Sequence, residues 1–185
     1  GVVTVKDPEL AKQVYFYQNA EGTGLAPFDC WLLLRGLKTM HVRVERAQEN
    51  AMQIATFLQA HPLVTHVYYA GLPDHPSKAM HDAQAYGAGV VVCFRTGSYD
   101  FSRQVASAAA KSGLFKITVS FGSVNSLISL PGDMSHASIP AEVKKDREFP
   151  VDIIRLSIGI EDAGDLIAVL DSALRSAGAP SGARL

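Results

Sequence analysis

The sequence lacks the motifs that mark self-contained catalytic centres. It contains no Cys-x-x-Cys pair, no His-Glu-x-x-His pattern, no Gly-x-Ser-x-Gly turn and no Walker phosphate loop. None of its six histidines stands in a cluster with cysteines or carboxylates at metal-ligand spacing. A metal centre, a hydrolase nucleophile turn and a nucleotide-phosphate loop are therefore not expected.

Strong charge and long apolar runs are also missing. The 185 residues carry 17 Lys and Arg against 18 Asp and Glu, a formal net charge of -1, so no basic field attracts nucleic acid. No apolar run approaches the roughly 20 residues that cross a bilayer. The two cysteines, Cys30 and Cys93, lie far apart in apolar surroundings, and each is expected to be a small buried hydrophobe. We expect a globular protein that binds neither nucleic acid nor membrane.

A long helical pattern runs from residue 26 to about residue 59, and Gly36 is the point at which it can bend. At 1.5 Å per residue such a helix is roughly 50 Å long, so it is expected to join two bodies of structure. Before it, Val2–Val5 has the pattern of a short strand, and Pro8 begins a helix that runs to about Asn19. Because the chain opens within a strand-like run, we expect it to begin inside a fold.

Beyond residue 61, strand and helix patterns alternate. The predicted strands are HVYYAG, GAGVVVCFR, FKITVSFGS and DIIRLSIGI. The continuous apolar run of the second strand predicts that both of its faces are covered. Four strands interleaved with helices indicate an α/β fold in which a sheet carries helices on one side.

The strand-like run Ile153–Ile160 carries an arginine near its start. Alternation places Ile154 and Leu156 on one face and Arg155, flanked by small residues, on the other. One interpretation is an ordinary strand face in contact with water. The other is an anion site, because a planar guanidinium can hold a carboxylate through two parallel hydrogen bonds.

A serine- and glycine-rich turn follows another predicted strand, and it contains Ser120, Gly122, Ser123 and Ser126. Such a turn can direct backbone N–H groups and hydroxyls at an anion, although Gly and Ser are also common in turns without a ligand. Combined with Arg155, the turn predicts a carboxylate pocket. Arg155 would supply charge and orientation, and Ser120 with the following N–H would form the rim.

Five blocks of sequence carry a more specific signal. They are QNAEGTGLAPFDCWLLLRGLKTM, YYAGLPDHP, VSFGSVNSLISLP, MSHASIP and IIRLSIGIED. In this order they resemble the Cys/Met-metabolism family of pyridoxal-phosphate (PLP) enzymes, and the resemblance extends from Gly1 to about Ala177.

The resemblance implies part of a fold-type I PLP enzyme. Residues 1–25 would be the end of the PLP-binding large domain, and residues 26–60 a long connecting helix. Residues 61–178 would be the C-terminal small domain, with a mainly antiparallel sheet and helices on one side. Residues 179–185 are expected to be a loose tail.

The resemblance also implies site residues. In such enzymes the arginine at the position of Arg155 binds the substrate α-carboxylate. Ser120 lines the same pocket, and Phe121 places its N–H or its ring beside the substrate. The family's Schiff-base lysine belongs shortly before the position of Gly1, so no catalytic residue is expected in this chain. Alone, the chain is expected neither to hold PLP nor to catalyse.

Within the family, the sequence of these blocks most resembles plant and algal carbon–sulfur lyases, which cleave cystathionine to homocysteine, pyruvate and ammonia in methionine biosynthesis. This implies an amino-acid substrate, a homotetramer in the full-length enzyme, and a plastid location, or the cytoplasm if the source is neither plant nor alga. Asn125 stands where many relatives have an acidic residue, so a γ-synthase or another transsulfuration enzyme stays open. A third alternative is a non-catalytic module that docks on a full-length partner through the apolar stretch CWLLLRGL.

Overall fold

The computed structural model describes residues 2–146 and 149–177. The chain divides into two compact units, Gly1–His41 and Val42–Leu185. The predicted division at residues 25, 60 and 178 stays a prediction, and the predicted loose tail, 179–185, lies outside the described residues.

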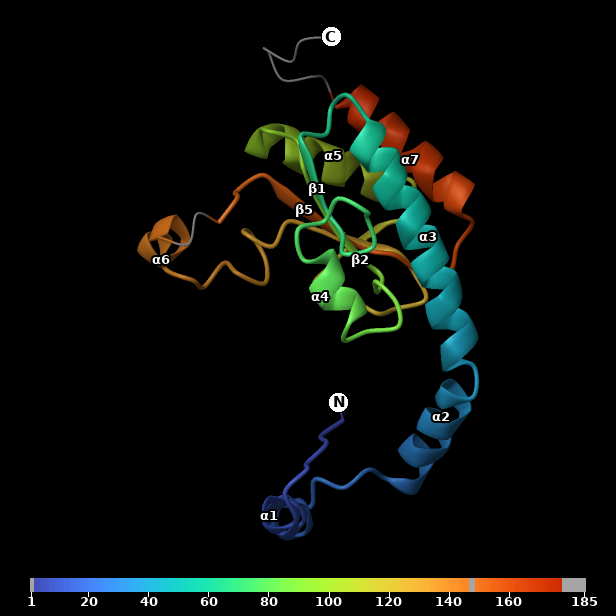
Figure 1. The fold of residues 1–185 in the computed structure, drawn as a ribbon, viewed down its shortest axis with the longest axis vertical. Helices are drawn as coiled ribbons and strands as arrows, with labels where there is room; N and C mark the ends of the chain where they lie inside the picture. The colour runs from blue at the N-terminus through green and yellow to red at the C-terminus, as the bar shows by residue number, and fades with distance from the viewer. Residues whose placement is uncertain (1, 147–148, 178–185) are drawn as a thin grey trace. The chain divides into compact units, whose positions relative to one another are not determined.

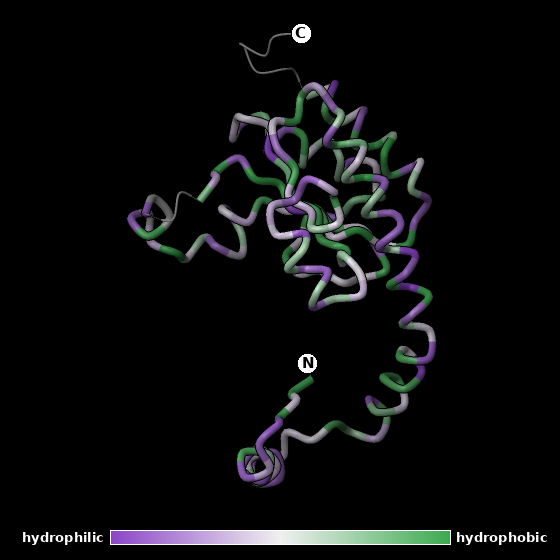
Figure 2. Tube along the Cα trace, viewed as in Figure 1, coloured by the Kyte–Doolittle hydropathy of each residue, from purple (hydrophilic) through white to green (hydrophobic). Residues whose placement is uncertain are grey.

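The first unit contains two helices, α1 (Pro8–Ala20) and α2 (Pro27–Leu37). The Asp7 side chain caps α1 by accepting hydrogen bonds from the Glu9 and Leu10 N–H groups, as expected for an acidic residue before Pro8. Residues 2–5 form no strand, contrary to the prediction. Neither helix has a buried residue, and hydrophobic residues recur along α2 (Figure 2).

The predicted single helix over residues 26–59 is wrong, because it is two helices. α2 ends at Leu37, and α3 (Met40–Ala60) begins three residues later. At the break the Thr39 N–H donates to the Gly36 carbonyl at 3.4 Å, a tighter turn than the α-helix makes. Glycine is a poor helix former and the threonine hydroxyl also reaches the Gly36 carbonyl, so the interruption falls at these residues.

The second unit is built on a five-stranded sheet in the order β1-β2-β5-β4-β3. The strands are β1 (His66–Tyr68), β2 (Val91–Arg95), β3 (Lys116–Ile117), β4 (Leu127–Ser129) and β5 (Ile153–Ser157). All pairs are antiparallel except β3 with β4. Sequence analysis predicted four strands and missed β4, whose three residues are all buried and so show no alternation.

Three helices cover one face of this sheet: α3, α5 (Tyr99–Lys111) and α7 (Ala163–Ser176) (Figure 1). The core lies between the sheet and these helices. Its fully buried members include Ile54, Leu58, Val92, Phe94, Val105, Ile128, Ile154, Leu156, Leu166 and Leu170. The expected mainly antiparallel sheet with helices on one side is therefore confirmed. Two short helices, α4 (Lys78–Asp82) and α6 (Ala141–Asp146), lie in the connections.

Strand β2 differs from its prediction. Val92 and Phe94 are fully buried, whereas Val91, Cys93 and Arg95 are only half-buried. One face of β2 is therefore covered by the core of this unit, and the other is left partly open in this chain.

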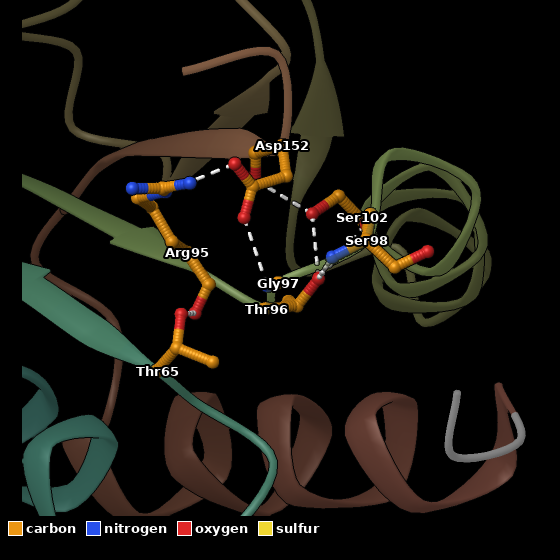
Figure 3. Close-up of polar contacts among 7 residues, drawn as sticks. All are labelled: Thr65, Arg95, Thr96, Gly97, Ser98, Ser102 and Asp152. Atoms are coloured by element: carbon orange, nitrogen blue, oxygen red, sulfur yellow. Dashed lines mark hydrogen bonds and ion pairs between the residues drawn. The ribbon is translucent and has the colours of Figure 1, made fainter. Parts of the chain in front are cut away.

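A buried carboxylate ties the end of β2 to the start of β5 (Figure 3). Asp152 is 3% exposed and accepts hydrogen bonds from Arg95 Nε at 2.9 Å and from the Gly97 N–H at 2.8 Å. Its carbonyl accepts from the Ser102 hydroxyl at 2.6 Å. The same hydroxyl lies 2.9 Å from Thr96 Oγ1, so strand, turn and helix α5 share one polar network.

Substitution of Asp152 tests this network. Asp152→Ala removes the acceptor for Arg95 and Gly97, and we expect a loss of about 2–3 kcal/mol in the free energy of unfolding, measured by urea denaturation. Asp82→Ala, which breaks an exposed pair with Lys78 on α4, is the control and should cost no more than about 0.5 kcal/mol. Equal losses in the two variants would contradict the account.

A buried histidine joins helix α3 to helix α7. His61 is 5% exposed, its Nε2 lies 3.3 Å from Asp171 Oδ1, and its Nδ1 accepts from the Leu63 N–H. Burial lowers the pKa of His61 below its usual value, with the Arg175 charge adding to the effect and Asp171 opposing it. His61 is therefore neutral in the folded protein at pH 7.

This histidine predicts a pH dependence. The unfolded chain takes up a proton at the normal histidine pKa near 6.5, above the pKa of the folded protein, so stability is complete above about pH 6.5 and falls below it. We expect His61→Gln to reduce the loss of unfolding free energy between about pH 7 and pH 5. The control His66→Gln, at an exposed position on β1, should keep the wild-type loss.

Candidate functional site

Arg155 lies in the middle of β5, the central strand of the sheet. It is paired with Cys93 of β2 on one side and with Ser129 of β4 on the other, and Cys93 is paired in turn with Tyr68 of β1. Directly opposed residues of antiparallel strands point to the same face. These four side chains therefore form a row on the face opposite the core, where Arg155 is half-buried.

The Arg155 guanidinium lies over an aromatic ring. Its Cζ lies 5.8 Å from the centre of the Phe121 ring, within the range of a cation–π interaction. Among the described residues, no side chain forms a hydrogen bond or an ion pair with it. The N–H groups of a guanidinium form a planar fork that can bind a planar anion through two hydrogen bonds.

The Ser120 turn lies beside this arginine because Phe121 belongs to it. Ser120 has φ +91°, a left-handed conformation that is strained for a residue with a side chain, and Gly122 has φ +82°. Ser120 and Phe121 are exposed. The structure thus brings Phe121 to Arg155, and Ser120 is the residue before Phe121 in the chain.

The segment that follows Arg155 holds this turn in place. The Ser157 hydroxyl accepts from the Gly122 N–H at 3.0 Å, and the Ile160 N–H donates to the Val124 carbonyl at 3.0 Å. Glu161 accepts twice from Ser126, from the N–H at 2.7 Å and from the hydroxyl at 2.9 Å.

Two further residues, Gly159 and Asn50, bring the turn and the segment after β5 close together. A Cβ added to Gly159 would collide with the Val124 carbonyl and with the Glu161 carboxylate, so glycine is required there. The buried Asn50 of α3 donates to the carbonyls of Gly159, at 3.1 Å, and of Glu161, at 2.7 Å. The turn is therefore fastened to the same backbone that carries Arg155 and, through Asn50, to the helical layer.

Sequence reasoning did not find Asn50, Ser126, Ser157 or Glu161 as site residues. Ser157 and Glu161 belong to the IIRLSIGIED block, so the family resemblance already marked this segment. Nothing in the sequence identified their hydrogen-bond partners, Gly122 and Ser126. The partners lie 35 residues away in the chain.

Cys93, which is paired with Arg155 in the sheet, does not add a nucleophile to this row. Burial raises the pKa of the Cys93 thiol to about 11, although the Arg155 charge acts against that rise, so Cys93 is a neutral thiol at pH 7. Cys30, expected to be buried, is exposed on α2. In the described part of the chain, no three His, Cys, Asp or Glu residues are grouped as metal ligands.

The residues around Arg155 suit a carboxylate better than a PLP cofactor. PLP needs a lysine amine for its Schiff base and an acidic partner for its ring nitrogen. Lys12 and Lys78 instead pair with carboxylates on their own helices, Glu9 and Asp82. The Arg155 row offers a guanidinium, a neutral thiol and hydroxyl groups, and it contains neither a lysine nor an acidic residue.

Comparison with known proteins places the chain in a family. The family model described as the Cys/Met metabolism PLP-dependent enzymes matches residues 1–175. The chain belongs to this family. Arg155, Ser120 and the residues that hold the turn all lie inside the matched region.

Individual relatives are similar over nearly the whole chain. The chloroplastic cystathionine β-lyase of Arabidopsis thaliana is 57% identical over 95% of this chain, and that of Mimosa pudica is 56% identical over 95%. A crystal structure of cystathionine γ-synthase from Xanthomonas oryzae pv. oryzae, in complex with cystathionine, matches with a TM-score of 0.85 and 36% identity over 94% of this chain. The chain spans only 37% and 38% of the two lyases and 44% of the synthase chain.

No helix within the described residues has the length and apolar character needed to cross a bilayer.

The strain at Ser120 can be measured. Glycine tolerates a left-handed φ without the Cβ penalty, so we expect Ser120→Gly to be about 1 kcal/mol more stable than Ser120→Ala in urea denaturation. The alanine variant is the matched control, because it also removes the hydroxyl but keeps the Cβ. Equal stability of the two variants would show that the backbone at residue 120 is unstrained.

Proposed function

We propose that this chain supplies the substrate-carboxylate site of a PLP-dependent carbon–sulfur lyase, a cystathionine β-lyase that cleaves cystathionine to homocysteine, pyruvate and ammonia in methionine biosynthesis. The observation that carries the proposal is Arg155, which stands without an ion-pair partner among the described residues on the open face of a central strand. The 57% identity to the chloroplastic lyase of Arabidopsis thaliana supports the choice of reaction.

In this proposal the protein's own residues bind and orient the substrate. The edge of the Arg155 guanidinium donates two parallel hydrogen bonds to the α-carboxylate. Ser120 and the N–H of Phe121 form the rim, and the Phe121 ring, which already lies over the guanidinium, limits the access of water. A carboxylate held at two points fixes the direction of the bonds at Cα, and orientation of this kind contributes strongly to rate.

The cofactor belongs to another part of the enzyme in this proposal. PLP supplies the electron sink for chemistry at Cα. We assign its Schiff-base lysine to sequence upstream of Gly1, so this chain alone binds no PLP and is inactive. The chain's coverage of 37% of the Arabidopsis lyase agrees with that assignment.

The exposed apolar residues of α2 support an assembly with further protein. Phe28, Trp31 and Leu34 are each more than half exposed, at 66%, 57% and 60%. Large exposed apolar surfaces of this kind are usually covered by another part of the protein or by another chain. We propose that the rest of the enzyme covers them within a homotetramer. The two chloroplastic relatives favour a plastid location.

Two alternatives have their own support. The similarity to a cystathionine γ-synthase structure keeps another transsulfuration reaction open, and analysis of the products of the complete enzyme separates the two. The exposed apolar α2 also suits a non-catalytic module that docks on a full-length enzyme. Such a module would be captured by that enzyme in a pull-down and would show no aldimine absorbance of its own.

Substitution of Arg155 in the complete, PLP-loaded enzyme tests the site. We expect Arg155→Ala to raise the KM for cystathionine by about 30–100-fold, because a charge-assisted, two-point contact is lost. Arg155→Lys should recover only part of the affinity, since an ammonium group lacks the planar pair of donors.

The control is Arg103→Ala on α5, which removes an arginine that lies over the Tyr99 ring away from this row. Its KM should stay at the wild-type value. A normal KM in Arg155→Ala would remove Arg155 from the substrate site.

A further inference from the structure

We propose that Glu161 is a positioning residue for substrate binding, which sets the place of Ser120 and Phe121 against Arg155 through its double contact with Ser126. The inference rests on the proposed function, because it concerns the same carboxylate site. Glu161 itself needs no contact with the substrate.

The turn needs an external anchor. Between the last residue of β3, Ile117, and the first of β4, Leu127, residues 119–125 are all exposed. Ser120 is also held in a left-handed conformation that a free serine avoids. A turn with little burial and a strained residue relaxes unless hydrogen bonds fix it.

Those hydrogen bonds come from residues 157–161. They fix the turn at its middle, through Gly122 with Ser157 and Val124 with Ile160, and at its end, through Ser126 with Glu161. Because the anchoring segment directly continues strand β5, it moves with Arg155. The separation between Arg155 and Ser120 is therefore set within one rigid piece of backbone.

Glu161 provides the charged anchor of this set. One carboxylate oxygen accepts from the Ser126 N–H and the other from the Ser126 hydroxyl, and hydrogen bonds to a charged acceptor are roughly twice as strong as neutral ones. The Ser126 hydroxyl also accepts from the Gly159 N–H, and Asn50 holds the Glu161 carbonyl. The backbone of Glu161 is thus held by Asn50, and its carboxylate holds the turn.

Kinetics of the complete, PLP-loaded enzyme give the first readout. We expect Glu161→Ala to raise KM by about tenfold and to change kcat by less than about threefold, since Arg155 stays and only the rim loses its place. Glu161→Gln keeps an acceptor for the Ser126 N–H, so its KM should rise only about two- to threefold. The matched control is Glu49→Ala on the exposed side of α3, where Glu49 pairs loosely with Arg46, and its KM should not change.

Hydrogen exchange gives a second readout that does not need turnover. In the same proteins without substrate, amide exchange of the peptide covering residues 118–127 should be fastest in Glu161→Ala, intermediate in Glu161→Gln and unchanged in Glu49→Ala. If the enzyme does not cleave cystathionine, the proposed function fails while this readout still tests the anchor.

The proposal is overturned if the KM and the loop exchange of Glu161→Ala match those of Glu49→Ala. It is also overturned if the variant only lowers Tm, because that is the result of a purely structural role. Should Glu161→Ala fail to fold, Glu161→Gln decides: faster exchange at residues 118–127 supports the anchor, and wild-type exchange refutes it.

Discussion

Strand β5 is hydrogen-bonded along both edges, and this double pairing fixes the site. A slip of one residue against β2 or β4 would turn Ile154 and Leu156 out of the core and Arg155 into it. Full burial of each of these aliphatic side chains contributes about 1.5–3 kcal/mol, and a buried, unpaired guanidinium would cost more still. The register that protects the core therefore also presents Arg155 on the open face, beside the Phe121 ring.

The rest of the site depends on how the backbone continues past that strand. Ser157, Ile160 and Glu161 each form a hydrogen bond with the turn at residues 119–126. Gly159 has no side chain, so the backbone after β5 can approach the backbone of this turn closely. This arrangement explains how a turn with seven consecutive exposed residues keeps a strained serine in place. The core side of the sheet supplies rigidity, and the open side carries the Arg155 guanidinium, so stability and the proposed binding site lie on opposite faces of one strand.

Local signals in the sequence predicted the elements that depend on nearby residues. Helix α1 begins at Pro8 as predicted, and the alternation in β5 correctly placed Arg155 on the face opposite the core. The errors have different causes. The three residues of strand β4 are all buried and show no alternation, and the helix break at Thr39 is a local turn that the helical pattern did not reveal. The Glu161–Ser126 contact was missed because it joins residues 35 positions apart. Whether Arg155, Ser120 and Phe121 bind substrate stays a prediction.

The most direct measurement is a crystal structure of the complete, PLP-loaded enzyme with an unreactive amino-acid analogue bound. The account predicts that the α-carboxylate of the analogue lies at about 2.7–2.9 Å from two nitrogens of the Arg155 guanidinium, with Ser120 and the Phe121 ring beside it. A carboxylate bound to another cation, with Arg155 facing water, would contradict the account.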